Sequence, residues 1–426
     1  MNNEKEFKDL PEGWKWARLG EVGEIIMGQS PASALVNQER NGIPFLQGSA
    51  EFGVKYPLPK NWIVKPIKIA PIGSILISVR APVGDINISN NVYGIGRGLS
   101  AIKINDSKAN NLFIWHNIYF YRNELVKISQ GSTFEAVGYK ELNNFLIPLP
   151  PLPEQQKIAE ILETVDNVIE KTDRIIEKYK RIKQGLMQDL LTKGIDESGN
   201  IRSEKTHKFK DSTLGRIPDE WAVVRLGEVG EIVSGSTPST YNYEYWNGKI
   251  VWITPNDLSN IEGIFIEDSS RKITQKGLKS CSAKIISADS VVVSSRAPIG
   301  YVKVSKVPFA TNQGCKSIEY NGKFSPVFLA FLLSNKVQNM INLGSGTTFQ
   351  EITKSNLANI PIPLPPLPEQ QRIAEILSQI DETIEKEEQY KEKLERIKQG
   401  LMEDLLTGKV RVNHLIKKSV KNVSTT

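Results

Sequence analysis

The stretch PLPPLPEQQ occurs twice in this sequence, at Pro148–Gln156 and again at Pro363–Gln371. The second copy lies 215 residues after the first, about half of the 426-residue chain. Each copy is followed by a long segment whose apolar residues recur with helical periodicity. A repeat of so long a period indicates a chain built from two similar halves. We therefore predict the order globule, helix, globule, helix, with a rigid proline-rich segment before each helix.

Composition restricts the class of protein. With 39% hydrophobic and 24% charged residues the chain is typical of globular proteins, and its length predicts two or three domains. No apolar run reaches the roughly 18 residues of a membrane span, and the N-terminus has no apolar signal core. Cys281 and Cys315 are too few for a disulfide framework, so we expect a cytoplasmic protein. The net charge of +6 is compatible with binding to nucleic acid but does not require it.

The first globule has the pattern of an α+β domain. Strand-like segments bounded by glycine, proline or asparagine occur at Gly73–Ser89 and Gly98–Ile104. The segment Leu112–Leu125 predicts a helix, with Asn110 or Asn111 as its cap. Because strands and helices do not alternate regularly, we predict an α+β domain.

The second globule repeats the first in the same order. Trp221 matches Trp14 at an offset of 207, whereas Arg296 matches Arg80 at an offset of 216. Nine extra residues must therefore lie between these two matches in the second copy. We expect them in TYNYEYWNGKIVWI at Thr240–Ile253, which is rich in tyrosine and tryptophan.

Both long helices have a seam of mostly apolar positions in steps of three and four, which is a heptad pattern. In the first helix they are Ile158, Ile161, Val165, Val168, Thr172, Ile175, Tyr179, Ile182 and Leu186. In the second they are Ile373, Ile376, Ile380, Thr383, Glu387, Tyr390, Leu394, Ile397 and Leu401. So narrow a stripe needs a partner, and we predict that the helices pair with each other, antiparallel.

An antiparallel pair would bring the two heptad centres, Thr172 and Glu387, together. A polar pair inside an apolar seam fixes the register of a coiled coil at some cost in stability. Alternatively, both side chains point to solvent where the seam opens. The pattern leaves both interpretations open.

Residues that would carry catalysis are missing from the sequence. His116, His207 and His414 have no cysteine, histidine or acidic neighbour at the spacing of metal ligands. There is no Walker A loop and no glycine loop of the kind that binds S-adenosylmethionine (AdoMet). We predict no catalytic, metal or cofactor residues in this chain.

Two pairs of matched polar residues are candidates for contact with nucleic acid. Arg80 and Arg296 lie in matching turns closed by proline and glycine, where the guanidinium can contact guanine or a phosphate. A salt bridge within the same domain is the alternative. Arg97 and Gln313 are matched positions with different hydrogen-bonding groups. Two modules that recognise different sequences would differ in this way, and so would two neutral surface positions.

Further candidates lie in glycine-containing loops and in an aromatic cluster. The loop hydroxyls suit phosphate contacts, or else ordinary helix caps: they belong to Ser132, Thr133, Ser345, Thr347 and Thr348. Tyr243 lies with Tyr241, Tyr245 and Trp246 in a cluster that either approaches DNA or forms part of a core.

These features together resemble the specificity (S) subunit of type I restriction-modification systems. The resemblance rests on the two PLPPLPEQQ stretches, each followed by IAEIL, and on the endings IKQGLMQDLL and IKQGLMEDLL. It covers almost the whole chain. In that family each globule is an α+β target-recognition domain that binds one half of a bipartite, asymmetric site in double-stranded DNA. The fold implied is two such domains separated by an antiparallel coiled coil, with a pseudo-two-fold internal repeat.

The resemblance also implies partners. The helices would dock two methyltransferase (M) subunits, and restriction (R) subunits would complete the enzyme. AdoMet, ATP and Mg²⁺ are implied for those partners, and this chain would be a non-catalytic DNA-binding subunit. The predicted boundaries are 1–147 for the first target-recognition domain, 148–195 for the central helix, 196–210 for a linker, 211–360 for the second domain, 361–410 for the C-terminal helix and 411–426 for a basic tail.

Two other functions stay open on the sequence alone. A coiled-coil scaffold with two protein-binding domains would show no salt-dependent affinity for DNA. A stand-alone methyltransferase would bind AdoMet by itself.

Overall fold

The structure is a computed structural model that describes residues 10–130, 136–296, 298–344 and 350–416. It consists of two compact units, the first formed by Met1–Asp173 and Tyr390–Thr426, the second by Arg174–Gln389. Within the described residues, no helix combines the length and the hydropathy needed to cross a membrane.

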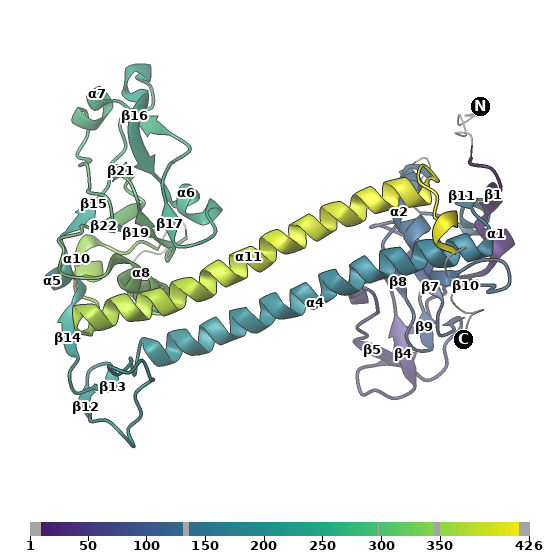
Figure 1. Ribbon diagram of the computed structural model, residues 1–426, viewed down its shortest axis with the longest axis horizontal. Coiled ribbons are helices and arrows are strands. Elements are labelled where there is room, and N and C mark those ends of the chain that lie inside the picture. The colour runs from purple at the N-terminus through teal and green to yellow at the C-terminus, as the bar shows by residue number, and fades with distance from the viewer. Residues whose placement is uncertain (1–9, 131–135, 297, 345–349, 417–426) are drawn as a thin grey trace. The chain divides into compact units, whose positions relative to one another are not determined.

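Each unit contains one globular domain and one half of each of two long helices. These helices are α4 (Leu152–Leu190) and α11 (Leu367–Leu406), drawn in blue-teal and yellow in Figure 1. Both begin inside the repeated PLPPLPEQQ stretch, as the sequence predicts. The proline-rich segment forms the strand that precedes each helix, namely β11 (Leu146–Leu149) and β23 (Pro361–Leu364).

The first domain is made of short strands and three helices. Its strands are β1 (Lys15–Arg18), β2 (Gly23–Met27), β3 (Val36–Asn37), β4 (Ile43–Leu46), β5 (Asn61–Ile63), β6 (Ile69–Ala70), β7 (Ile75–Ser78), β8 (Ile86–Ile88), β9 (Tyr93–Ile95), β10 (Leu99–Ile104) and β11. Its helices are α1 (Leu19–Val22), α2 (Asn111–Gln130) and α3 (Tyr139–Asn143). The strands form sheets in the orders β2-β10-β7-β8 and β3-β5-β4-β9-β6, and β1 pairs with β11.

The second domain repeats this architecture after a hairpin, β12 (Phe209–Ser212) and β13 (Gly215–Pro218). Its strands are β14 (Ala222–Arg225), β15 (Ile232–Ser234), β16 (Trp246–Ile253), β17 (Phe265–Ile266), β18 (Lys272–Ile273), β19 (Val291–Ser294), β20 (Val302–Ser305), β21 (Phe309–Thr311), β22 (Cys315–Ile318) and β23. Its helices are α5 (Leu226–Val229), α6 (Pro255–Asn260), α7 (Gln275–Lys279), α8 (Pro326–Asn335), α9 (Val337–Leu343) and α10 (Lys354–Ala358). The sheets have the orders β15-β22-β19-β20-β17 and β18-β16-β21, and β14 pairs with β23. Both domains are therefore α+β, as predicted.

The strand registers correct the predicted position of the extra residues. Leu46 pairs in parallel with Ile95, and Ile253 pairs in the same way with Thr311. Leu46 and Ile253 differ by 207, whereas Ile95 and Thr311 differ by 216, so the net nine residues follow Ile253. The prediction of an insertion within 240–253 is wrong because that segment supplies strand β16. The extra length instead surrounds β18 and includes helix α7.

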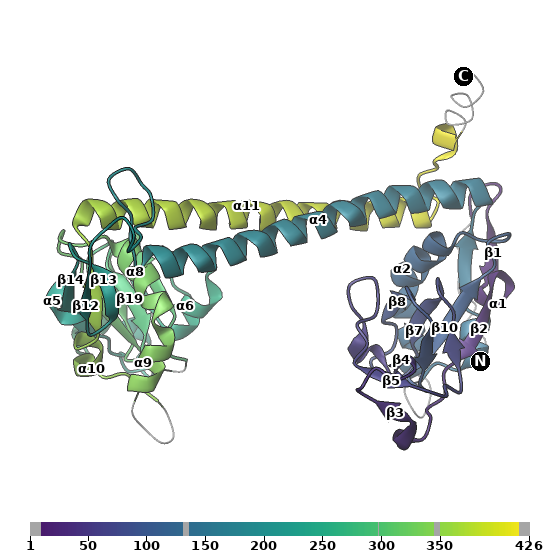
Figure 2. The ribbon, with the colours of Figure 1, turned by 90° about the horizontal axis from the view of Figure 1, so that it is seen from below.

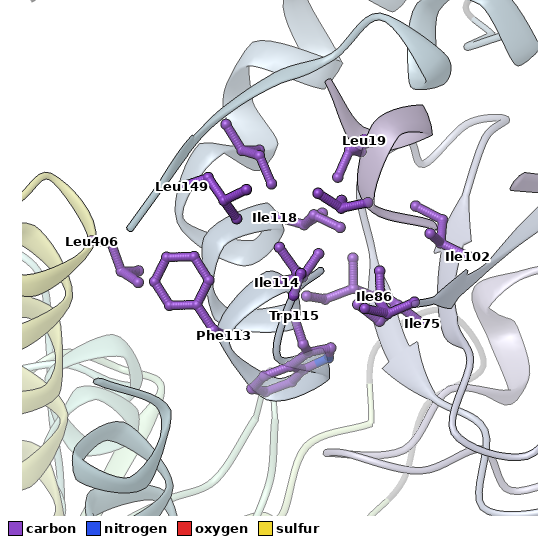
Figure 3. Packing of buried hydrophobic residues seen from close by; sticks show 14 of the residues in the cluster. Leu19, Ile75, Ile86, Ile102, Phe113, Ile114, Trp115, Ile118, Leu149 and Leu406 are labelled. Carbon is purple, nitrogen blue, oxygen red and sulfur yellow. The ribbon is translucent and has the colours of Figure 1, made fainter. Parts of the chain in front are cut away.

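One hydrophobic core joins the first domain to its halves of the long helices. Helix α2 lies between these helices and the sheet of β7 and β10 (Figure 2). Phe113 of α2 points toward Leu406 of α11, and Ile114 lies beside Ile75 and Ile86 of the sheet (Figure 3). The C-terminal half of α11 is thus part of the core of the N-terminal domain.

Each long helix begins with a buried glutamate that is held by a tryptophan and an arginine. In the first unit, Glu154 accepts hydrogen bonds from Trp14 Nε1 at 3.1 Å and from Arg411 at 2.7 and 2.8 Å. In the second, Glu369 accepts hydrogen bonds from Trp221 Nε1 at 3.2 Å and from both terminal nitrogens of Arg202. Each arginine follows the end of the other long helix, so a charge-assisted contact joins the start of one helix to the end of its partner.

The next residue of the repeated stretch fixes the helix against its domain. Gln155 accepts a hydrogen bond from Asn110 N at 2.8 Å and donates one to Pro150 O at 2.8 Å. Gln370 makes the same contacts with Ser325 N at 2.9 Å and with Pro365 O at 2.8 Å. Asn110 also caps α2, as predicted, by accepting a hydrogen bond from Phe113 N. The glutamate of PLPPLPEQQ therefore connects the start of its helix to the segment that follows the other long helix. The glutamine connects the same helix to its own domain.

Within each unit the two long helices run antiparallel. In the first unit, Lys398 pairs with Asp166 at 2.5 Å and Lys391 with Asp173 at 2.7 Å. In the second unit, Lys183 pairs with Asp381 at 2.5 Å. In these three pairs the residue numbers add up to 564, and in a fourth pair, Lys180 with Glu388 at 2.6 Å in the second unit, they add up to 568. Nearly constant sums are the mark of an antiparallel pair, which confirms the predicted pairing.

The centre of the seam differs from the prediction. A seam centred on Thr172 and Glu387 would give a sum of 559, whereas the ion pairs between the helices give 564 and 568. Thr172 is only 3% exposed, which contradicts a position in solvent, and its hydroxyl donates to Val168 O of its own helix at 3.0 Å. Glu387 is half-buried.

Four residues predicted for the seam are exposed instead: Ile175, Ile182, Tyr390 and Ile397, at 38–48%. The adjacent Ile176 is buried at 6%. An α-helix of 3.6 residues per turn drifts by about 20° per heptad against a strict 3.5 repeat. Along helices of this length the contact face therefore moves from one heptad position to its neighbour.

The glutamate contacts predict a specific loss of stability. Arg202→Ala leaves the carboxylate of Glu369, 9% exposed, without its counter-charge. We expect the second unit to lose about 3–5 kcal/mol of unfolding free energy, the range for breaking a buried ion pair. The control is Arg216→Ala, whose side chain is 49% exposed and pairs with Glu204, where the loss should be about 0–1 kcal/mol. Urea unfolding followed by tryptophan fluorescence measures both, and equal losses would contradict the prediction.

Candidate nucleic-acid interface

Arg80 and Arg296 occupy the same place in the two domains. Arg80 follows β7 and forms an antiparallel bridge with Ala136, whereas Arg296 follows β19 and forms the same bridge with Glu351. The side chain of Arg80 is exposed and that of Arg296 is 34% exposed. Backbone hydrogen bonds from Val137 N to Val79 O and from Ile352 N to Ser295 O, both 2.9 Å, hold the two turns in equal geometry.

The surroundings of the two arginines differ in charge. Arg296 Nη1 lies 3.7 Å from a carboxylate oxygen of Glu351, whose other oxygen lies 3.2 Å from Lys316 Nζ. Lys316 also donates to Ser295 Oγ at 3.4 Å and to Gln313 O at 3.3 Å. Arg296 therefore makes the salt bridge within its own domain that the sequence left as the alternative.

The described residues of the first domain form no equivalent network. The position of Glu351 is taken by Ala136, and the strand registers put Ser100 where the second domain has Lys316. Ser100 is fully buried and donates to Ile26 O at 3.2 Å. Among the described residues of the first domain, no carboxylate forms an ion pair with Arg80.

Arg97 and Gln313 also occupy matching turns, one before β10 and one before β22. The side chain of Arg97 is exposed, and its backbone N–H donates to Ser30 Oγ at 3.3 Å. Gln47 Nε2 donates to the same Ser30 oxygen at 2.8 Å. Gln313 is exposed as well, and its side-chain oxygen accepts a hydrogen bond from Thr237, the residue that matches Ser30. The two turns are built alike but present different functional groups.

The backbone brings the two candidate turns of each domain together. Val79 N donates to Gly98 O at 2.9 Å, and Ser295 N donates to Gly314 O at 2.8 Å. Arg80 and Arg97 are the direct neighbours of the first pair, and Arg296 and Gln313 of the second. Each domain therefore has one face on which two polar side chains lie at the ends of adjacent strands. We call these faces the first and second turn faces.

The aromatic cluster of the second domain divides into core and surface. Trp246 is 7% exposed and stacks edge-on against Trp252 at a centroid distance of 5.1 Å. The guanidinium of Arg271 lies 3.6 Å from the centre of the Trp246 ring. Tyr241 and Tyr243 are 93% and 87% exposed. The tryptophans therefore form the core, and the two tyrosines remain available for an external partner.

The remaining residues that the sequence analysis considered do not lie on the described turn faces. Ser132, Thr133, Ser345, Thr347 and Thr348 lie outside the described residues. His116 is buried at 1%, with Nε2 3.8 Å from Asp166. Burial, together with Lys398 and Lys55, lowers its pKa to about 3. A neutral histidine in the core has no role on a turn face.

Sequence reasoning missed Lys316, Glu351 and Gln47. Lys316 lies in a buried strand, Glu351 forms an isolated bridge with Arg296, and neither belongs to a sequence motif. Only the mismatch with Ser100 and Ala136 in the repeat would have singled them out.

Comparison with known proteins agrees with this architecture. The family model of the Type I restriction modification DNA specificity domain matches residues 11–181 and 218–396. The MjaVIII specificity subunit of a type I restriction enzyme from Methanocaldococcus jannaschii is 31% identical, over 97% of this chain and 97% of that protein. The putative MjaX specificity subunit of the same organism is 30% identical, over 96% of both chains.

A solved structure extends the likeness to the fold. The S subunit of a type I restriction-modification system from M. genitalium superposes with a TM-score of 0.59 over 94% of this chain and 98% of that one. At 16% identity this comparison concerns the fold alone. The family model matches both halves of the chain, and the relatives align along nearly its whole length. The chain therefore belongs to the type I restriction modification DNA specificity family.

Proposed function

We propose that this chain is the DNA-recognition subunit of a type I restriction-modification enzyme. The observation that carries the proposal is the pair of turn faces, which share one backbone geometry but differ in side chains. In a chain of the specificity family, two such faces suit a bipartite, asymmetric DNA site, of which each domain recognises one half. Methyltransferase and restriction subunits, with AdoMet, ATP and Mg²⁺, supply the chemistry.

The side chains of the two faces suit different bases. An arginine pairs through two hydrogen bonds with guanine O6 and N7, whereas a glutamine does so with adenine N6 and N7. Arg80 and Arg97 thus favour guanine or phosphate on the first face. On the second face Gln313 favours adenine, and Glu351 is an acceptor for the cytosine amino group. Tyr243 is a candidate for contact with sugar or base at the edge of this domain.

The long helices have two roles in this proposal: they set the spacing between the half-sites, and they dock the M subunits. The spacing between the half-sites on DNA follows from the distance between the two rigid domains that bind them. A stiff antiparallel helix pair provides such a separation, and each helical turn of about 5.4 Å corresponds to roughly one or two base pairs.

Exchange of one domain tests whether each domain recognises one half of the DNA site. Replacing Glu12–Leu146 with the first domain of another family member should change one half of the methylated sequence and leave the other half as it was. Sequencing of methylated adenines in cells that express the chimera with its partners measures both halves. A change in both halves would contradict the assignment of one half-site to each domain.

Alanine substitutions test the turn faces. In the assembled complex, we expect Arg80→Ala and Arg296→Ala each to weaken specific DNA binding about 5- to 150-fold, the equivalent of about 1–3 kcal/mol for a lost base contact. The effect of Arg80→Ala should be the larger, because Glu351 already holds Arg296. Lys108→Ala and Lys323→Ala are matched controls, because they remove one exposed charge at the far ends of β10 and β22. Wild-type affinity in both arginine variants would remove these residues from the interface.

Insertion of four residues into both α4 and α11 tests the spacing role. Four residues add about 6 Å, just over one turn, so the spacer between half-sites should grow by about two base pairs. The same insertion in α4 alone is the control, because it disrupts the antiparallel register and should reduce binding without defining a new spacer. An unchanged spacer in the double insertion would refute the role of the helices in spacing.

A further inference from the structure

Arg271 is an exposed arginine of the second domain whose charge is held by aromatic rings and not by a carboxylate. Its guanidinium carbon lies 3.6 Å from the centre of the Trp246 ring and 5.7 Å from that of Trp252. The carboxylate nearest to it in sequence, that of Asp268, pairs with Lys272 at 3.0 Å instead. Within the described chain, the Arg271 side chain forms no ion pair and donates no hydrogen bond. The rings therefore fix the position of the guanidinium while its N–H groups keep their capacity to donate.

Hydrogen bonds also fix the backbone on which Arg271 stands. Ser269 Oγ donates to Arg271 O at 2.7 Å and accepts a hydrogen bond from Trp252 N at 2.9 Å. Ser270 N donates to a carboxylate oxygen of Asp257 at 2.8 Å, and Asp257 is buried. An arginine whose backbone and side chain are both held in place loses little conformational entropy when it binds a ligand. Such preorganisation suits a ligand that has to be met in one orientation.

Arg271 lies at the edge of the second turn face. Nε1 of Trp252, one of the two rings beside Arg271, donates to Ser236 O at 3.1 Å. The next residue, Thr237, donates its hydroxyl to the side-chain oxygen of Gln313, which belongs to that face. A continuous set of contacts therefore connects the ring beside Arg271 with the side chain that the proposed function assigns to base recognition.

The first domain carries a different residue at the same place. The strand registers match Arg271 with Asn61, because Ile273 and Ile63 each follow by two residues and pair with isoleucines that are 207 residues apart. Arginine pairs with guanine through two hydrogen bonds, whereas asparagine does so with adenine. The two domains thus differ in functional group at this position, as they do on the turn faces.

We propose that Arg271 is a specificity-determining residue that recognises a guanine in the half-site of the second domain. This inference rests on the proposed function and adds a residue to the second turn face. Two hydrogen bonds to guanine O6 and N7 require the guanidinium to lie in the plane of the base, and a stacked ring holds that plane. A phosphate contact would use the charge of Arg271 but would carry no sequence information. The half-site of the second domain should therefore contain a G·C pair.

The test measures base discrimination by the assembled complex. The cognate site is first identified by sequencing methylated adenines, and affinity is then measured for duplexes in which one base pair at a time is changed. For the wild type, we expect replacement of one G·C pair in the second half-site to weaken binding about 5- to 150-fold. In Arg271→Ala this penalty should disappear, while every position of the first half-site keeps its own. Arg271→Lys retains the charge but not the planar fork, so it should lose most of the penalty as well.

Lys279→Ala is the matched control. Lys279 is exposed, forms no ion pair with a described residue, and lies beyond the other end of β18 from Arg271. Its substitution removes the same charge from the same part of the domain, and it should leave the affinity for every duplex at the wild-type value.

Several results would overturn the inference while the proposed function survives. An equal loss of affinity for all duplexes in Arg271→Ala, with a salt slope smaller by about 0.9, would identify a phosphate contact. Unchanged discrimination with a lower melting temperature would show that the contact with Trp246 only stabilises the domain. A second half-site without a G·C pair, or full discrimination in Arg271→Lys, would also contradict it. A wild-type complex without any sequence preference would instead refute the proposed function.

Discussion

A buried carboxylate at the start of each long helix is the contact on which this structure depends. Burying a carboxylate is costly unless it is paired and hydrogen-bonded. Glu154 and Glu369 meet this condition only when a tryptophan from the opening strand region and an arginine from beyond the other helix both reach them. Each unit is therefore closed by three segments that are far apart in the sequence. The antiparallel pairing of α4 and α11 is the arrangement that brings these segments together.

The two domains share the strands that carry the turn faces and differ in the side chains at the ends of these strands. The bridges at Arg80 and Arg296, and the hydrogen bonds at Gly98 and Gly314, are the same in both domains. What differs is the side chain that each backbone position presents, such as Ala136 against Glu351. A rigid sheet with variable loops is a common basis for binding sites of different specificity. The two copies of the repeat therefore share the backbone contacts that stabilise the domain and differ in the side chains that are candidates for binding.

The long helices carry apolar residues on more than one face. Lysine and aspartate pairs flank the contact between them, and Ile176, Ile384 and Leu394 are buried. The heptad pattern contains a second set, Ile175, Ile182, Tyr390 and Ile397, that this contact leaves exposed. The sequence pattern merges the two sets, because they occupy adjacent positions.

Sequence alone was enough to predict the repeat, the α+β class, the extent of both helices and the pairs of matched turn residues. These features follow from local periodicity and from comparison of one half of the chain with the other. Tertiary structure decided the place of the extra residues, the centre of the helix seam and the network of Lys316 with Glu351. Each of these depends on which residues face one another across elements distant in sequence. In the seam of the long helices, a drift of a few degrees per residue changes which residues meet without any change in the local pattern.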